Sequence, residues 1–151
     1  MPRDDTPRRR AAPGEGGLRT AVGHLGDRWS LLIVDGLLGG PRRFNELAEA
    51  LGDIAPNVLS QRLRQLERDG LVLALPYSTR PPRYAYQLTA SGAALVGVMR
   101  LLAHWGAEHA GGDGASPLVH EACGTPAEPR WWCPTCERTL DDAELDVVTW
   151  V

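Results

Sequence analysis

The sequence predicts a mainly α-helical winged helix-turn-helix with a small β-wing, followed by a small C-terminal Cys/His ribbon. Three patterns support this fold class. Two short amphipathic segments are joined by a turn between residues 44 and 70, and two strand-like runs then flank a proline-rich tip. Near the C-terminus, cysteine and histidine occur in pairs at metal-ligand spacing.

Two helices are expected ahead of the helix-turn-helix. Residues 1–17 have little to bury and are predicted to form a disordered arm. A short helix over residues 18–25 ends at Gly26, and Asp27 offers a side-chain oxygen to cap the next helix, residues 28–38. The predicted core-facing stripe of that helix is Trp29, Leu32, Ile33, Gly36 and Leu37.

The helix-turn-helix itself starts near Phe44. Apolar residues recur there at helical spacing, and Gly52 ends the first helix. Pro56 suits the first position of the second helix because the N–H that proline lacks would be unpaired there. The apolar stripe of this second helix is Leu59, Leu63 and Leu66.

The opposite face of the second helix gathers amide, hydroxyl and guanidinium groups, which can read base edges and phosphates in a DNA major groove. Its residues are Asn57, Ser60, Gln61 and Arg64, with Arg68 further along. From this stretch alone, an ordinary solvated face of a helical hairpin is the alternative interpretation.

Beyond Gly70, residues 71–77 and 84–88 read as two strands around the tip at residues 78–83. A β-hairpin in this place is a wing. Arg80 and Arg83 flank two prolines at its tip, where they are well placed for a minor groove or its phosphates. A solvated turn is the alternative.

Residues 90–110 predict one long helix with a seam of Leu95, Val98, Leu102 and Trp105. A single small domain would cover only part of this apolar surface, so a homodimer about a two-fold axis is expected. A monomer with a well-buried helix is the alternative. Close packing is a plausible reason for Gly92, Gly97 and Gly106.

Charge is distributed unevenly along the chain. The formal net charge is −3, yet residues 18–110 carry ten arginines against eight acids, whereas residues 111–151 carry two arginines against eight acids. No apolar run reaches membrane-spanning length, and the N-terminus lacks an apolar signal core. We therefore expect a cytoplasmic protein with no membrane partner.

Together, these motifs resemble the HxlR-type transcriptional regulators, relatives of the MarR-like winged-helix proteins, over roughly residues 18–106. The matching segments are Gly26 to Trp29, Pro41 with Arg43 and Phe44, Leu59 to Leu63 with Leu66, Gly70 to Val72, Pro81 and Pro82 before Tyr86, and Leu88 and Thr89 with Gly92.

The resemblance implies a homodimeric, sequence-specific regulator on a two-fold-related operator in double-stranded DNA, and not an enzyme. The second helix would lie in the major groove and the wing on the flank. The expected DNA-binding residues are Arg43, Asn57, Ser60, Gln61, Arg64, Arg80 and Arg83. Members of the family often respond to stress or metabolites, which leaves room for a small-molecule effector that the sequence does not identify.

Two departures from the family pattern matter. Ala55 stands before Pro56 where the pattern usually has Ser or Thr, so the second helix lacks the customary cap. The thiol-sensing subgroup carries a cysteine near the N-terminus, whereas the first cysteine here is Cys123. That sensing mechanism cannot be transferred to this chain.

Residues 111–117 are predicted to be a linker and residues 118–151 a zinc-ribbon-like tail. His120 with Cys123, and Cys133 with Cys136, form two pairs with two residues inside each pair, the spacing that grips one tetrahedral ion. One structural zinc ion per chain is expected. The alternative is a degenerate ribbon with inert or redox-active cysteines. A zinc deaminase would need His-x-Glu and a proline before Cys133, and neither is present, so no catalytic residues are expected.

A protein-interaction module is the competing function. In that case the winged fold would not bind DNA, and the acidic tail would dock a partner.

Overall fold

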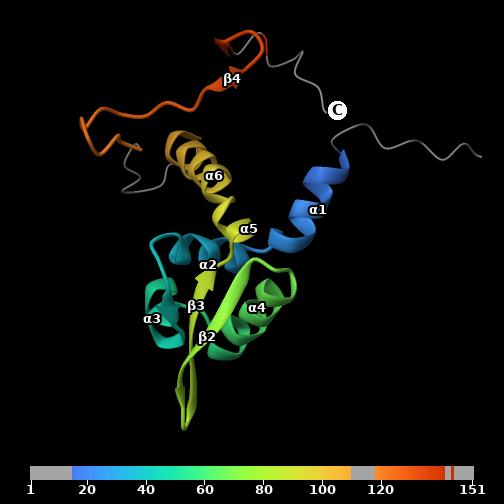
Figure 1. Ribbon diagram of the computed structural model, residues 1–151, viewed down its shortest axis with the longest axis vertical. Helices are drawn as coiled ribbons and strands as arrows, with labels where there is room; N and C mark the ends of the chain where they lie inside the picture. Colours follow the sequence, from blue (N-terminus) through green and yellow to red (C-terminus); the bar gives the residue numbers. More distant parts are fainter. Residues whose placement is uncertain (1–14, 110–117, 142–143, 145–151) are drawn as a thin grey trace, which may run out of the picture. The chain divides into compact units, whose positions relative to one another are not determined.

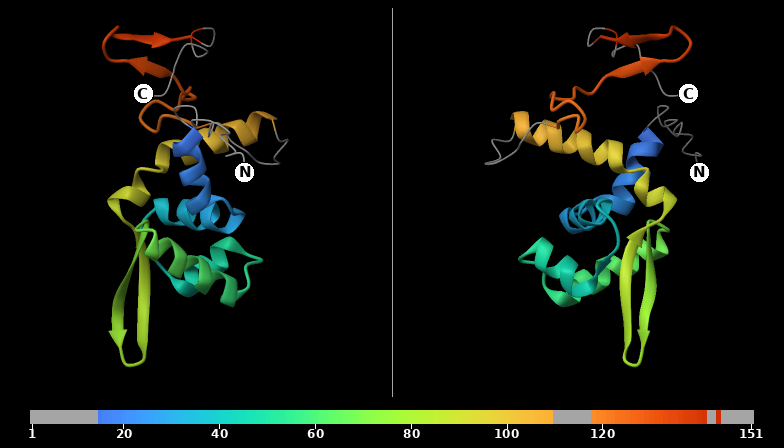
Figure 2. Two further views of the ribbon diagram at one scale, coloured as in Figure 1. Left: turned by 90° about the vertical axis from the view of Figure 1, so that its right-hand side faces the viewer. Right: turned by 60° about the vertical axis from the view of Figure 1, so that its left-hand side comes forward.

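The computed structural model describes residues 15–109, 118–141 and 144 (Figures 1 and 2). The chain divides into two compact units, one spanning His24–Pro129 and the other combining Met1–Gly23 with Arg130–Val151. The predicted linker and most of the predicted arm lie outside the described residues, and the predicted domain boundaries stay a prediction. Within the described ranges, no helix has both the length and the apolar content needed to cross a bilayer.

The unit spanning His24–Pro129 has the winged-helix order of elements, with α1 leading into it. Its elements are the last two residues of α1 (Glu15–Leu25), followed by α2 (Arg28–Leu38), β1 (Arg42–Arg43), α3 (Phe44–Leu51), α4 (Pro56–Arg68), β2 (Val72–Thr79), β3 (Pro82–Leu88), α5 (Ala90–Ala93) and α6 (Val96–His109). The predicted bounds of α2 and α3 and the predicted start of α4 are confirmed. Helix α1 starts before the predicted Leu18, so Glu15 to Gly17 belong to a helix and not to the arm.

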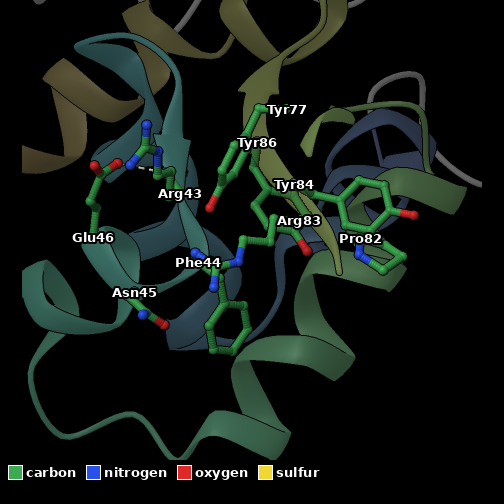
Figure 3. Close-up of a pocket in the computed structure, with 9 residues that line it drawn as sticks. All are labelled: Arg43, Phe44, Asn45, Glu46, Tyr77, Pro82, Arg83, Tyr84 and Tyr86. Atoms are coloured by element: carbon green, nitrogen blue, oxygen red, sulfur yellow. Dashed lines mark hydrogen bonds between the residues drawn. The ribbon is translucent and has the colours of Figure 1, made fainter. Parts of the chain in front are cut away.

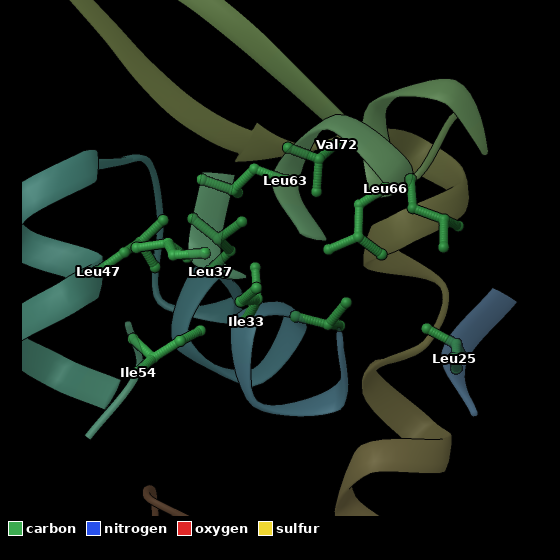
Figure 4. Close-up of a cluster of buried hydrophobic side chains, with 11 residues drawn as sticks. Leu25, Ile33, Leu37, Leu47, Ile54, Leu63, Leu66 and Val72 are labelled. Atoms are coloured by element: carbon green, nitrogen blue, oxygen red, sulfur yellow. The ribbon is translucent and has the colours of Figure 1, made fainter. Parts of the chain in front are cut away.

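The core lies where α2, α3 and α4 meet (Figure 4). Ile33, Leu47, Leu59 and Leu66 have no exposed surface, and full burial of such a side chain contributes roughly 1.5–3 kcal/mol. The predicted stripe of α2 is wrong at Leu32, which is 42% exposed. Ser30 and Val34 are buried in α2 together with Ile33 and Leu37.

Ser30 can be buried because Asp27 satisfies its hydroxyl. The Ser30 Oγ donates to Asp27 Oδ2 at 2.6 Å, and the N–H groups of Trp29 and Ser30 donate to Oδ1 at 3.0 and 3.1 Å. The N-cap predicted at Asp27 is thereby confirmed. Burial alone would raise the pKa of Asp27, but the hydrogen bonds from Ser30 and the charge of Arg62 outweigh it and hold the pKa below its usual value.

The wing belongs to a three-stranded antiparallel sheet with the order β1-β3-β2. Strand β1 was not predicted, because two residues are too few to show a strand pattern; Arg42 pairs with Tyr86. The predicted six-residue tip is also wrong. Pairing resumes after an irregularity at Tyr77 and joins Ser78 to Arg83, so only Arg80 and Pro81 lie outside the strands.

The predicted long helix is two helices, α5 and α6, separated at Ala94 and Leu95. Thr89 caps α5 by accepting from the Gly92 N–H at 3.0 Å, and its own hydroxyl donates to the Gly70 carbonyl at 2.7 Å. After α5 the chain forms a tighter turn of the 3-10 type, in which the Leu95 N–H donates to the Gly92 carbonyl three residues earlier. Leu95 packs against the core, whereas Val98, Leu102 and Trp105 remain exposed.

Gly92 sits directly against the backbone of Leu71, as the predicted close packing requires. A Cβ at Gly92 would collide with the Leu71 carbonyl oxygen, whereas a Cβ at Gly97 or Gly106 would meet nothing within 4 Å among the described residues. The expectation of close packing is confirmed for Gly92 alone; at the other two glycines the described part of the chain provides no packing reason.

Gly92→Ala should lower the free energy of unfolding by about 1–3 kcal/mol, because the backbone of Leu71 has to move to admit the methyl group. Chemical denaturation measures this loss. Gly97→Ala is the matched control and should not destabilise the protein, because alanine favours a helix over glycine by about 0.8–1 kcal/mol. Equal midpoints for Gly92→Ala and the parent would contradict the prediction.

Candidate nucleic-acid interface

The outward face of α4 brings together the polar residues expected to read DNA. Asn57, Ser60, Gln61, Arg64 and Arg68 line one shallow hollow on this helix. Leu59, Leu63 and Leu66 on the other side are at most 1% exposed. The two faces are therefore separated as the helical period requires, with apolar groups in the core and hydrogen-bonding groups toward solvent.

Helix α4 begins as predicted, with Ala55 at the N-cap and Pro56 in the first turn, and no side chain caps it. The Ala55 backbone is extended, with φ −66° and ψ 138°, and its carbonyl accepts from the N–H groups of Val58 and Leu59. A hydroxyl at position 55 could accept a further hydrogen bond from a first-turn N–H.

The acidic end of α4 is engaged by neighbouring side chains. Gln65 donates to both carboxylate oxygens of Asp69 at 3.0 Å, and His24 Nδ1 lies 3.2 Å from Asp69 Oδ2. The hydrogen bond from Gln65 outweighs burial and, together with His24 and Arg68, lowers the pKa of Asp69. The carboxylate is thereby held at the C-cap of α4, and Asp69 is not among the residues that line the hollow.

Arg62 is a residue of α4 whose role was not foreseen. Its Nε lies 3.3 Å from Asp27 Oδ1, so the N-cap of α2 also forms an ion pair with α4. Arg62 falls within the resembling segment from Leu59 to Leu63, but helical spacing within α4 does not identify a partner on another helix. The pair is about one third exposed on both sides, so it contributes orientation more than stability.

The wing and the start of α3 enclose a hollow that contains two arginines and three tyrosines (Figure 3). The Arg43 guanidinium lies 4.6 Å from the centre of the Tyr77 ring, a cation–π contact between the N-cap of α3 and strand β2. The Arg43 N–H donates to Glu46 at 2.6 Å. In Figure 3 the Arg83 side chain extends across the hollow toward Phe44.

Arg43 and Arg83 line the same hollow, although Arg83 itself lies near the tip of the hairpin, where Arg80 is exposed. Arg83 pairs within the sheet opposite Ser78, so it belongs to strand β3 beside the tip, whereas Arg80 lies in the turn itself.

The predicted metal ligands lie in two turns. His120 Nδ1 is 3.3 Å from Cys123 Sγ, and Cys133 and Cys136 are joined by a hydrogen bond between their thiols. Hydrogen bonds from the backbone and thiol of Cys136, followed by the Thr135 backbone, lower the pKa of Cys133, while the same thiol contact raises the pKa of Cys136. All three thiols are free, and in the part of the chain that is described no three candidate ligands gather into one cluster.

The sequence matches the family model of the HxlR-like helix-turn-helix over residues 24–113. The chain belongs to the HxlR family. A Mycobacterium tuberculosis protein named as an HTH-type transcriptional regulator, Rv3095, is 41% identical over 118 residues, which are 77% of this chain and 74% of that protein. YodB of Bacillus subtilis, also an HTH-type transcriptional regulator, is 34% identical over 88 residues, covering 58% and 79% of the two chains.

Solved structures agree with this assignment. The reduced form of YodB superposes with a TM-score of 0.56 at 33% identity and covers 64% of this chain and 96% of YodB. A candidate transcription factor of Pseudomonas aeruginosa, PA1374, gives a TM-score of 0.64 at 35% identity, with 83% and 86% covered. The winged-helix fold and its place among transcriptional regulators of the HxlR and MarR type, which are not enzymes, are thus established.

Ala55→Ser should stabilise the protein by about 0.5–2 kcal/mol, because its hydroxyl can accept from an N–H of the first turn of α4. Thermal or denaturant unfolding measures the gain. Ala55→Val, which adds bulk without an acceptor, is the control and should bring no gain. A melting temperature that stays unchanged in Ala55→Ser would mean that the cap is satisfied in another way.

Proposed function

We propose that this HxlR-family regulator binds operator DNA as a homodimer, with α4 in the major groove and the wing on the flanking minor groove or phosphates. The observation that supports this proposal is the outward face of α4, where Asn57, Ser60, Gln61, Arg64 and Arg68 line one exposed surface. The regulator would act in the cytoplasm, where it can reach the chromosome.

The chemistry of that face suits a base-reading surface. Amides can bond adenine bidentately, and arginine does the same to guanine or contacts phosphate. Gln61 and Asn57 are exposed near the start of α4, the end of a recognition helix whose residues usually reach base edges. We assign base reading to these two amides. Asp69, which would repel phosphate, is engaged by Gln65 and His24.

The wing supplies positive charge at a defined place relative to α4. Strand β1 ties the wing to the start of α3, because Arg42 and Arg43 pair with β3. In Figures 1 and 2 the β2–β3 hairpin projects past the helices of its own unit. Arg80 at the tip is assigned to the minor groove or its phosphates, and Arg83 beside the tip and Arg43 at the start of α3 are assigned to the phosphate backbone.

The apolar surface of α6 supports the homodimer. None of its residues is buried, and Val98, Leu101, Leu102 and Trp105 are all between 43% and 59% exposed. An exposed stripe of this kind on one helix is typical of a protein–protein interface. A second copy is the simplest occupant, because a two-fold dimer also presents two α4 helices to a two-fold-related operator.

A protein-interaction module remains the second candidate function, and it is favoured by the same exposed apolar surface of α6. The two candidate functions differ in how binding depends on salt. Contacts to DNA phosphates release counterions, so the affinity for DNA falls as salt rises, whereas a protein docking surface on α6 makes no phosphate contacts.

DNA binding is tested by fluorescence anisotropy on the chain's own upstream DNA and on a scrambled duplex, each at several salt concentrations. The logarithm of the association constant should fall linearly with the logarithm of salt. Arg80→Ala should weaken binding to both duplexes about equally and reduce the slope by about 1. Gln61→Ala should instead lose about 1–3 kcal/mol of discrimination at particular base pairs.

The matched control is Arg100→Ala, which removes one exposed arginine from α6, on the side of the domain away from the wing tip (Figure 1). It should leave both affinity and slope unchanged. Binding without any salt slope would favour the interaction module. Equal loss on every sequence for Gln61→Ala would overturn its assignment as a base-reading residue.

The dimer is tested by light scattering on the full chain. Leu102→Glu should convert dimer to monomer and raise the dimer dissociation constant at least about 100-fold, because an unpaired charge would be buried in the interface. The circular dichroism spectrum should not change, since Leu102 is 47% exposed in the single chain. Arg100→Ala, on the opposite side of the helix, should stay dimeric. A parent protein that is monomeric at micromolar concentration would contradict the proposal.

A further inference from the structure

Three cysteines and His120 have no part in the proposed DNA binding. Cys123 and Cys136 are exposed, Cys133 is partly exposed, and all three are free thiols. Four side chains that can bind a metal ion thus lie within residues 120–136. Two backbone turns carry them, and each turn brings the two members of one pair into contact.

The first turn runs from Val119 to Pro126, which form an antiparallel bridge across it. Inside, the N–H groups of Cys123 and Gly124 both donate to the His120 carbonyl, and the His120 N–H donates to the Thr125 carbonyl at 2.8 Å. Gly124, directly after Cys123, has a φ of 68°. The turn brings the His120 ring nitrogen and the Cys123 sulfur to 3.3 Å, on the same side of the backbone.

The second turn connects β4 (Trp131–Cys133) to β5 (Arg138–Leu140), with Cys133 paired to Arg138. Backbone N–H groups of Thr135 and Cys136 are directed at the Cys133 sulfur. Glu137, directly after Cys136, has a φ of 52°, and it is the one residue other than glycine with positive φ in the described ranges. This left-handed conformation is unfavourable for a residue with a side chain, and the flanking pair of Cys133 and Arg138 closes the turn around it.

The two turns share one design. In each, antiparallel pairing flanks the turn, the ligand candidates stand first and fourth, and the residue after the second candidate is left-handed. Each turn therefore presents two donors for one ion, and neither turn alone has the four that a closed tetrahedral site needs.

We propose that His120, Cys123, Cys133 and Cys136 bind one structural zinc ion per chain. A tetrahedral zinc site needs four ligands, and the two turns together provide three thiolates and one imidazole, which is a common zinc ligand set. Soft sulfur donors favour zinc over magnesium or calcium. A closed shell leaves no position for water, so the ion organises the tail and does not catalyse. Its ligands lie outside the winged-helix elements, so the zinc site and DNA binding can be tested independently of each other.

Metal analysis of the full chain, purified under reducing conditions and dialysed with zinc, tests the site. About one zinc ion per chain is expected. Cobalt(II) added to the apo-protein should produce the intense visible absorption of tetrahedral coordination together with thiolate charge transfer. Zinc should also protect the tail from protease, because binding free energy at such a site is folding free energy.

Ligand and control variants sharpen the test. Cys136→Ser and His120→Ala should each lower bound zinc at least about 10-fold after mild chelation, whereas the non-ligand changes Thr135→Ala and Glu121→Gln should retain it. No zinc in the parent chain would overturn the proposal. Half an equivalent that is insensitive to His120→Ala would overturn it as well, since two chains would then share an ion through Cys133 and Cys136.

Discussion

The rotation of α4 about its own axis is the constraint on which the rest of the structure depends. Leu59, Leu63 and Leu66 must all face α2 and α3, where they are almost completely buried. Because a helix turns by 3.6 residues, this burial leaves only one outward face, and that face carries Asn57 and Gln61. A rotation by one residue would withdraw leucine from the core and bury an amide or a guanidinium, which costs several kcal/mol.

Polar contacts at the edges of the core hold this arrangement and connect it to the wing. Asp27 has two tasks, because its carboxylate caps α2 and pairs with Arg62 of α4 at 3.3 Å. On the other side, Arg43 pairs with β3 through its backbone and lies over the Tyr77 ring with its side chain. The recognition helix is thus tied to the start of α2, and the wing is tied to the start of α3.

Local sequence signals were sufficient for the helix-turn-helix and its polar face. Asp27 is followed by a helix because its carboxylate caps the free N–H groups, and Pro56 begins one because proline suits the first turn. Gly52 ends α3 with a φ of 67°, which glycine adopts without strain. The residues of the α4 face follow from the helical period alone, because the period places them opposite the buried leucines.

What the sequence by itself determined is therefore the helix-turn-helix, because its signals act within a few residues along the chain. The tertiary structure alone decided the features that depend on distant partners. Gly92 must approach the Leu71 carbonyl, and the helix predicted to continue through it breaks at Ala94 and Leu95. Likewise, β1 is a strand only because β3 is there to pair with it. No local pattern reports contacts between residues so far apart in the chain.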